Sequence, residues 1–269
     1  KAKTFYDAAR VKSLREIGEF HFPKPRPVSP HGVVTPSSLV ADLRKIGLRA
    51  GDIVCLHVGM KAMGRVVGGA RTVVEAMFDA VSPGGTVMMA TYSGDLSDPA
   101  EWRHPQVAAE SIERVREDML GYDPMLTPTR GVGSVAEYFR TYPGVIRSPH
   151  PQSSFAALGC HASLLVGEHP YDFRFGWKSP LGALVRLKGR VLMLGAPDDT
   201  ASLFHLMRFN AEAPVVAKRA PVMVSGRCIW QDYRDVDYPA DWFYAGMLHL
   251  RDTKIAHGGI VGLAYSTLF

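Results

Sequence analysis

The chain has 269 residues, of which 46% are hydrophobic, and a formal charge of +5. That length suffices to bury a large core in one domain or in two small ones. No apolar run approaches the roughly 18 residues of a membrane-spanning helix, and no segment resembles a signal peptide. Three cysteines (Cys55, Cys160 and Cys228) are too few and too scattered for a disulfide framework or a metal site. We therefore expect a cytoplasmic protein with no metal and no membrane partner.

The basic residues are dispersed along the chain, although the pI is about 9.1. Nucleic-acid-binding domains usually gather such residues on one face, whereas a mild excess of positive charge also suits the phosphates of a small cofactor. We expect no nucleic-acid partner.

The N-terminal part predicts two elements ahead of the main domain. Hydrophobic residues recur at helical spacing within residues 1–22, which predicts a short amphipathic helix. Alternating prolines from Pro23 to Pro30 exclude a helix or an inner strand and predict an extended strap. Thr35 and Pro36 then cap a helix over residues 39–46. We divide the chain into residues 1–34 and a main domain over residues 35–269.

Strands and helices alternate in the main domain. Continuous apolar runs predict buried strands at Ile53–Val58, Thr86–Tyr92 and Arg190–Gly195. Helices are predicted over residues 70–80, 135–141, 162–166 and 179–186. This alternation is typical of an α/β fold with a largely parallel sheet that helices cover on both faces. Residues 93–134 predict a long irregular loop, and a smaller β-containing C-terminal part follows, with a hairpin at Gly226 and Arg227.

Two polar segments lie at expected strand ends. In Arg147–Gly159, prolines flank His150 and predict a rigid turn that the histidine ring braces. In Asp198–His205, two aspartates and a threonine predict a helix N-cap, which places His205 about a turn and a half into the helix. Because α/β proteins place their chemistry at such strand ends, His205 is a candidate catalytic residue. A buried histidine bonded to a carbonyl is the alternative.

Several other residues allow two interpretations each, one functional and one structural. Lys61 either reaches a phosphate as a point charge or is a solvated surface lysine. Gly68 and Gly69 either open backbone N–H groups to a phosphate or form a plain turn. Four aspartates are candidates to bind a cationic amine, although aspartates in long loops usually form turns: Asp95, Asp98, Asp123 and Asp172.

Several motifs match one family in their order along the chain: Val66–Val73, Tyr92–Pro99, Asp123–Pro124, Thr127–Gly131, Arg147–Phe155, Asp172–Arg174, Ser179–Gly182 and Thr200–His205. By these motifs, residues 35–265 resemble the aminoglycoside 3-N-acetyltransferases. The resemblance implies a three-layer α/β/α sandwich on a mixed, largely parallel sheet. It also implies an acyl-CoA-dependent N-acetyltransferase of antibiotic resistance or antibiotic biosynthesis. Acetyl-CoA would be its co-substrate, and an amine of an aminoglycoside or a related natural product would be the acceptor.

The resemblance also assigns residues to the site. His205 would be the general base on the substrate amine, since a neutral imidazole can accept a proton. A carboxylate near it in the chain would orient the ring in place of the family's acid: Asp199, with Asp198 and Glu212 as the alternatives. The residues expected to bind acyl-CoA are His57, Lys61, Gly64, Gly68, Gly69, Ser153, Phe155 and Thr200. Those expected to bind the amine substrate are Tyr92, Asp95, Asp123, Asp172 and Arg208. Simple packing is the alternative for Ser153 and Phe155.

Two positions depart from the family pattern. Arg208 stands where the family has an acid three residues after the histidine, and Gly59 stands where it tends to have serine. Arg208 would favour an acceptor with an anionic or hydrogen-bond-accepting group. The alternative is a diverged member with lost or altered acyl transfer, which binds a ligand or runs different chemistry. The amine, the acyl chain and the oligomeric state, a homodimer included, stay open.

Overall fold

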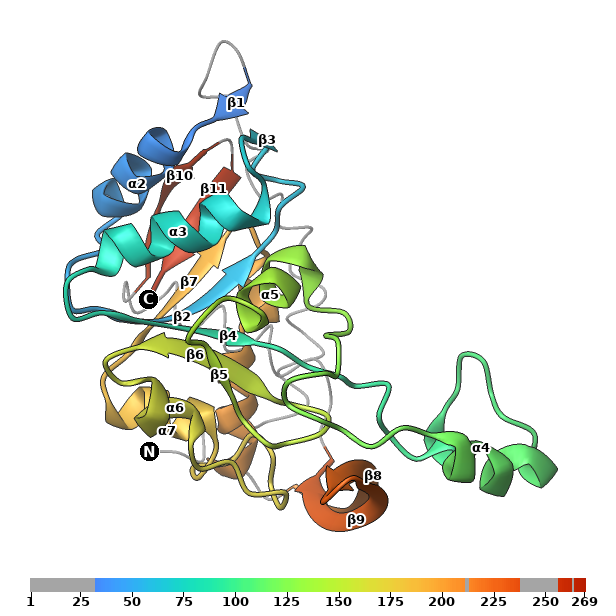
Figure 1. Ribbon diagram of the computed structural model, residues 1–269. Coiled ribbons are helices and arrows are strands. Elements are labelled where there is room, and N and C mark those ends of the chain that lie inside the picture. Colours follow the sequence, from blue (N-terminus) through green and yellow to red (C-terminus); the bar gives the residue numbers. More distant parts are fainter. Residues whose placement is uncertain (1–31, 211–212, 238–255, 263) are drawn as a thin grey trace, which may run out of the picture.

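The computed structural model describes residues 32–210, 213–237, 256–262 and 264–269, with a seven-stranded sheet at the centre (Figure 1). Across the sheet the strands follow the order β10 (His257–Val261), β11 (Ala264–Leu268), β7 (Arg190–Leu194), β2 (Ile53–Val58), β4 (Thr86–Ala90), β6 (Phe155–Gly159) and β5 (Ile146–Arg147). A short parallel pair joins β1 (Val33–Val34) to β3 (Arg65–Val66). The helix predicted within residues 1–22 and the proline strap lie outside the described residues, so the division after residue 34 stays a prediction.

The sheet is mixed, as predicted, but its parallel part is confined to three strands. β2 pairs in parallel with β4 on one side and with β7 on the other. The outer pairings are antiparallel: β4 with β6, β6 with β5, β7 with β11, and β11 with β10. The expectation of a largely parallel sheet therefore holds only at the centre. A continuous apolar run indicates burial on both faces, and it does not record the direction of the neighbouring strand.

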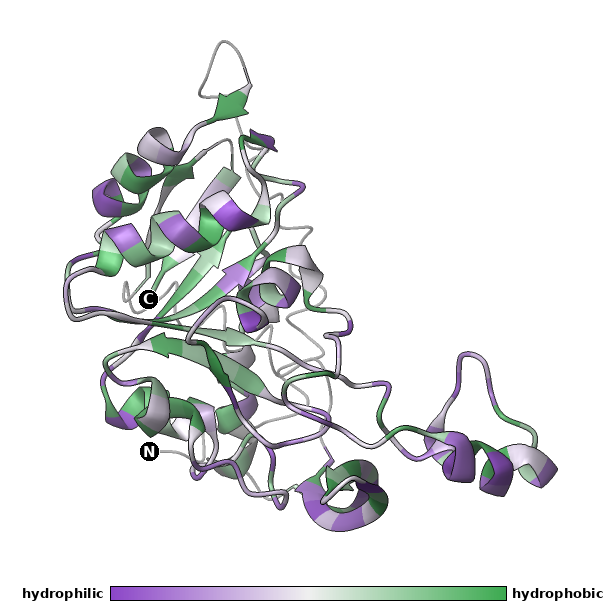
Figure 2. Ribbon diagram, viewed as in Figure 1, coloured by the Kyte–Doolittle hydropathy of each residue, from purple (hydrophilic) through white to green (hydrophobic). Residues whose placement is uncertain are grey.

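Helices cover both faces of this sheet, which makes the expected three-layer α/β/α sandwich. One face carries α2 (Pro36–Lys45), α3 (Ala70–Val81) and α5 (Gly133–Arg140). The other face carries α6 (Ala162–Val166), α7 (Pro180–Arg186) and the 3-10 helix η5 (Ser202–Asn210). In Figure 2 the central strands are mostly hydrophobic, whereas the helices carry both hydrophobic and hydrophilic residues. This distribution fits helices that bury one side against the sheet.

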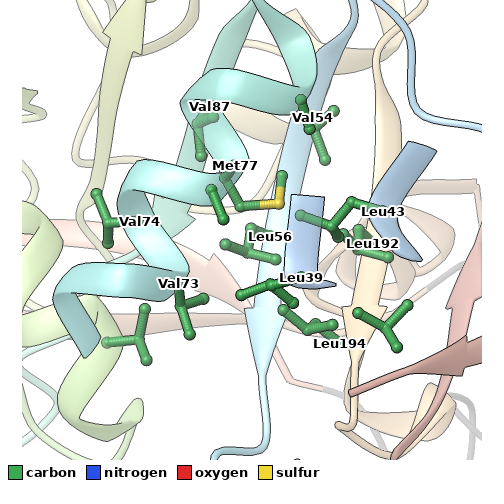
Figure 3. Packing of buried hydrophobic residues seen from close by; sticks show 14 of the residues in the cluster. Leu39, Leu43, Val54, Leu56, Val73, Val74, Met77, Val87, Leu192 and Leu194 are labelled. Carbon is green, nitrogen blue, oxygen red and sulfur yellow. The ribbon is translucent and has the colours of Figure 1, made fainter. Parts of the chain in front are cut away.

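Alternate side chains of the central strands enter two separate cores. Val54 and Leu56 of β2 are fully buried on the α2–α3 side, and Cys55 between them is fully buried on the opposite side. Figure 3 shows Leu56 close to Leu39 of α2 and Met77 of α3. Burying one such side chain contributes about 1.5–3 kcal/mol. The two-residue period of the strand therefore stabilises both helical layers at once.

Capping residues fix the starts of two helices. The Ser38 N–H donates to the Thr35 hydroxyl at 3.2 Å, and the Thr35 N–H donates to the Ser38 hydroxyl at 3.0 Å. This reciprocal capping box starts α2 at Pro36, three residues before the predicted start. Ser179 caps α7 with Pro180 at the first helical position, as predicted.

Residues 93–134 are largely irregular, as expected from the sequence, but part of this segment is helical. They contain η2 (Pro99–Glu101), η3 (Ala109–Ser111) and α4 (Ile112–Asp118), which form an arm that extends away from the sheet (Figure 1). The Arg116 guanidinium of α4 contacts the Asp98 carboxylate at 2.7 Å, with both side chains largely buried. A helix of seven residues is too short to be stable alone, so a tertiary contact of this kind has to hold it. The same contact accounts for Asp98 as a structural residue.

The predicted hairpin is present as a separate two-stranded sheet of β8 (Val215–Val224) and β9 (Arg227–Val236). Its turn lies at Ser225 and Gly226, one residue before the predicted Gly226 and Arg227, with φ angles of 49° and 77°. Positive φ at both positions matches the twist of the two strands. The Trp230 indole N–H donates to a backbone carbonyl of α4 at 3.4 Å, so the hairpin contacts the arm.

Candidate active site

A cavity of about 440 Å³ opens at the carboxyl ends of the three parallel strands. Its walls come from the ends of β2 and β4, the segment after β7 and the start of α5 with the residues before it. The lining residues are Leu56, His57, Val58, Gly59, Met89, Ala90, Tyr92, Gly131, Val132, Gly133, Ala196, Pro197, Thr200 and Ser202. Ligands of α/β proteins bind at this edge of the sheet. The walls are mostly apolar, with a few hydroxyls and one imidazole, which is the composition of a small-molecule site.

Gly59 lets two backbones meet at the edge of this cavity. A Cβ atom at residue 59 would lie 2.1 Å from the Gly195 carbonyl oxygen. The Gly59 N–H also donates to the Leu194 carbonyl at 2.9 Å. The serine of the family pattern does not fit here unless the backbone after β7 moves. The departure at residue 59 is therefore a steric requirement of this cavity wall.

Three residues from separate parts of the chain form a hydrogen-bonded wall of the cavity. The Tyr92 hydroxyl, just after β4, donates to Ser202 Oγ at 2.8 Å. The Ser202 N–H donates to His57 Nε2 at 3.4 Å, so this nitrogen carries no proton. Burial lowers the pKa of His57 to about 4. The imidazole in the wall is therefore neutral at pH 7.

His205 lies beside this wall, one 3-10 turn after Ser202. Residues three apart share one face of a 3-10 helix, so His205 follows Ser202 along η5. Its ring stacks on Phe175, with centroids 3.9 Å and planes 5° apart. Phe175 in turn packs edge-on against Tyr92, at 5.5 Å between centroids. The candidate base is thus adjacent to the cavity, although it is not one of the lining residues.

The segment between β7 and His205 is not the continuous capped helix that the sequence predicts. Asp198–Thr200 form a short 3-10 helix, η4, with no side-chain cap bond, and the extended Ala201 separates it from η5. Thr200 lines the cavity, as expected for a ligand-binding residue, and its hydroxyl donates to the Pro197 carbonyl at 2.6 Å. Asp199 is exposed, and its role as the orienting carboxylate stays a prediction.

His150 braces the turn after β5, as predicted. Its Nδ1 accepts the N–H groups of Gln152 at 3.2 Å and Ser153 at 3.3 Å. Its Nε2–H donates to the Tyr171 carbonyl at 3.2 Å. Burial, and next the neighbouring His169, hold the pKa of His150 well below its usual value. Both ring nitrogens are occupied in the neutral form, so His150 is a structural residue.

Ser153 and Phe155 are not among the residues that line the cavity, and their contact with acyl-CoA stays a prediction. Ser153 is 1% exposed, and its hydroxyl is bonded to His150 Nδ1 at 3.1 Å. Phe155 is fully buried and packs edge-on against Tyr92, behind the wall. The turn buries both side chains, which favours the packing alternative for both.

Two predicted amine-binding carboxylates have structural partners instead. Asp123 accepts the backbone N–H groups of residues 125 and 126 at 2.7 and 3.1 Å and forms a turn. Asp172 accepts the Arg234 N–H at 2.7 Å and contacts its guanidinium at 2.6 Å. These bonds to Arg234 lower the pKa of Asp172. Neither residue lines the cavity, and their turn-forming and ion-pair contacts explain them without a ligand.

Asp95 is the predicted carboxylate that lies near the cavity. Its side chain is 3.7 Å from the Arg130 guanidinium, and Arg130 directly precedes the lining segment Gly131–Gly133. Both side chains are at least half exposed, so the pair is weak and a cationic ligand can compete for the carboxylate. The side chain of Arg208 lies outside the described part of η5, and its role stays a prediction.

The predicted phosphate-binding residues lie outside the cavity walls. Lys61 is exposed in the turn two residues after Gly59. Gly64, Gly68 and Gly69 have φ angles of 78°, 79° and 61°, which favour glycine and agree with the plain-turn alternative. A phosphate contact at these positions stays a prediction.

Sequence reasoning missed Ser202, although the residue lies inside the motif Thr200–His205. A serine shortly after aspartates and a threonine looks like one more capping residue. The available signal was its position three residues before His205, which puts both on one face of a helix.

The fold and the cavity define an α/β enzyme that acts on a small molecule, because a mostly apolar site with few polar groups lies at the ends of parallel strands. Within the described residues, no helix is both long and apolar enough to cross a membrane.

Comparison with known proteins identifies the family. Residues 55–269 match the sequence profile of aminoglycoside 3-N-acetyltransferase. Aminoglycoside N(3)-acetyltransferase VIII of Streptomyces fradiae is 44% identical over 218 residues, which cover 77% of this chain and 72% of the relative. The crystal structure of YokD protein from Bacillus subtilis superposes with a TM-score of 0.84 at 36% identity, over 87% of this chain and 88% of that chain. The binary complex of AAC-IIIb with CoASH gives a TM-score of 0.77 at 33% identity, over 88% and 91%. The chain belongs to the aminoglycoside 3-N-acetyltransferase family and is an N-acetyltransferase.

Proposed function

We propose that the protein transfers the acetyl group of acetyl-CoA to an amine of an aminoglycoside or a related amine-bearing natural product, in the cytoplasm. The observation that carries the proposal is the cavity of about 440 Å³ at the carboxyl ends of β2, β4 and β7 in a chain of this family. AAC-IIIb, a relative by structure, binds CoASH. Mostly apolar walls with a few hydroxyls suit the uncharged thioester arm of that co-substrate.

The amine acceptor approaches from the exposed side of the cavity, near Asp95. An exposed carboxylate beside Gly131–Gly133 attracts a cationic amine, while the apolar walls disfavour an ammonium ion inside the cavity. His205, one 3-10 turn from the wall residue Ser202, accepts the proton of the amine as its nitrogen attacks the thioester carbonyl. Stacking on Phe175 holds the imidazole plane in one orientation.

A panel of amines tests the proposal. Purified protein is incubated with acetyl-CoA and with aminoglycosides of different charge, or with less cationic amines, and free CoA is measured together with the mass of the amine. We expect CoA release that depends on the amine and a product heavier by one acetyl group. If acetyl-CoA binds but none of the amines causes the release of CoA, the result would instead support a diverged family member with altered chemistry.

Lys61 carries a separate prediction about co-substrate binding. We expect Lys61→Ala to raise the KM for acetyl-CoA several-fold and to leave kcat nearly unchanged, because a phosphate contact binds ground state and transition state equally. Lys45→Ala is the matched control, since Lys45 ends α2 at the opposite edge of the sheet. Steady-state kinetics with varied acetyl-CoA measure both constants. An unchanged KM in Lys61→Ala removes this lysine from the site.

A further inference from the structure

The hydroxyl of Ser202 differs from those of Tyr92 and Thr200 in the cavity wall, because its proton is not donated to another protein atom in the described ranges. The Tyr92 hydroxyl donates a hydrogen bond to Ser202 Oγ at 2.8 Å, and the Thr200 hydroxyl donates one to the Pro197 carbonyl at 2.6 Å. Ser202 Oγ is the acceptor in its bond with Tyr92, so its own proton remains available for another acceptor. Within the described ranges of the chain, no protein atom accepts that proton.

The backbone and the buried neighbours of Ser202 hold this hydroxyl in place. Ser202 is 5% exposed, and its N–H is bonded to His57 Nε2 at 3.4 Å. That nitrogen is an acceptor, and His57 is neutral at pH 7, so the imidazole offers no competing N–H at this position. A donor fixed by two partners and facing a cavity with mostly apolar walls is preorganised for a ligand oxygen.

We propose that Ser202 is a catalytic residue whose hydroxyl donates a hydrogen bond to the thioester carbonyl oxygen, and that Tyr92 is a positioning residue that acts through it. The inference rests on the proposed function. The amine nitrogen forms a bond to the carbonyl carbon, and the carbonyl π pair moves to the oxygen, where the Ser202 O–H stabilises the new negative charge. The pair then returns, the carbon–sulfur bond breaks, and CoA leaves as a thiolate.

The protons and the role of Tyr92 follow from the same geometry. The proton that the amine loses passes to His205 and then to the thiolate, while Ser202 keeps its own proton throughout. The Tyr92 O–H polarises the Ser202 hydroxyl, since hydrogen bonds in a chain strengthen one another. Ser202 therefore makes the contact with the substrate, and Tyr92 increases its strength.

Kinetics of four variants test this assignment. We expect Ser202→Ala to lower kcat by about 10²-fold to 10³-fold, as loss of an oxyanion donor does, with the KM for acetyl-CoA within about threefold of the wild-type value. Tyr92→Phe is expected to lower kcat by about tenfold, and the double variant to be no slower than Ser202→Ala, because Tyr92 acts through Ser202. Ser202→Thr, which keeps the hydroxyl, should retain most of the activity. Tyr138→Phe on α5, outside the cavity walls, is the matched control.

An infrared measurement tests the same contact without any turnover. The carbonyl of bound acetyl-CoA, labelled with ¹³C, should absorb at lower frequency in the wild-type protein than in water. In Ser202→Ala the band should move back to higher frequency while acetyl-CoA still binds. Equal bands in the two proteins, or equal kcat values, would overturn the assignment. Absence of amine-dependent acetyl transfer in the wild-type protein would overturn the proposed function, and the infrared comparison would still decide on Ser202.

Discussion

Replacing His205 by alanine is expected to lower kcat by about 10²-fold to 10⁴-fold, the usual contribution of a positioned general base. The stacked contact with Phe175 at 3.9 Å fixes the ring, but His205 is only partly buried. Its removal should therefore shift the melting temperature little. Steady-state kinetics and thermal unfolding of the purified variant measure the two effects.

A second histidine variant separates catalysis from stability. His161 precedes α6, and its N–H donates to the hydroxyl of Thr86 at the amino end of β4, away from the cavity. His161→Ala should leave kcat unchanged. If His205→Ala unfolds or loses no activity, the alternative of a structural histidine is correct, and the base must be sought elsewhere.

The free energy of unfolding is expected to fall steeply as the pH drops from 7 to 5. Three histidines are neutral at pH 7 in the folded protein: burial lowers the pKa of the half-buried His57 and of the buried His169 to about 4, and it holds the pKa of His150 well below the usual value. Between their ordinary pKa of 6.5 and the folded values, the unfolded chain binds protons that the folded chain does not. Their stabilising contribution is therefore complete above pH 6.5 and is lost as the pH falls toward 4. His57 and His169 each account for about 2 kcal/mol at pH 5 relative to pH 7.

The hydrogen bonds explain why these rings resist protonation. His150 Nδ1 faces two backbone N–H donors, so a proton on that nitrogen would break both bonds. His169 Nδ1 accepts the Ser148 hydroxyl at 2.9 Å while its Nε2–H donates to the Arg174 carbonyl at 2.7 Å. The two imidazoles are 4.9 Å apart, so a charge on one also opposes a charge on the other.

Urea unfolding at pH 7, 6 and 5 measures this dependence. His169→Asn should be less stable at pH 7 but should lose about 1.4 kcal/mol less per pH unit below pH 6, because one titrating group is gone. A free energy of unfolding that stays constant between pH 7 and pH 5 contradicts the prediction.

Much of the fold follows from local sequence signals. The apolar runs of β2, β4 and β7, the Ser179-Pro180 helix start and the Ser225-Gly226 turn each record one local preference of the backbone. Strand direction and the arm do not follow from such signals. A strand sequence does not state which way its neighbour runs, and α4 depends on an ion pair between residues 18 positions apart.

The sequence predicts where in the fold the site lies, but it predicts only some of the residues that line it. His57, Tyr92 and Thr200 follow strand ends, and all three line the cavity. Ser153 and Phe155 follow the same logic, yet the turn around His150 folds them inward, and a turn's direction is a tertiary property. The role of Ser202 could not be predicted from local sequence for a related reason, because its partners Tyr92 and His57 are 110 and 145 positions away.

The close contact between Gly59 and Gly195 makes the substitutions allowed after β2 depend on the backbone path after β7. With 2.1 Å between a Cβ at residue 59 and the neighbouring carbonyl oxygen, any side chain at residue 59 requires a different backbone path at residue 195. A serine at residue 59 would therefore be tolerated only in a lineage whose 194–197 segment had already shifted. The dependence runs in one direction, because a Cβ at residue 195 would lie 3.2 Å from the Gly59 carbonyl oxygen, which is a tight contact but not a clash.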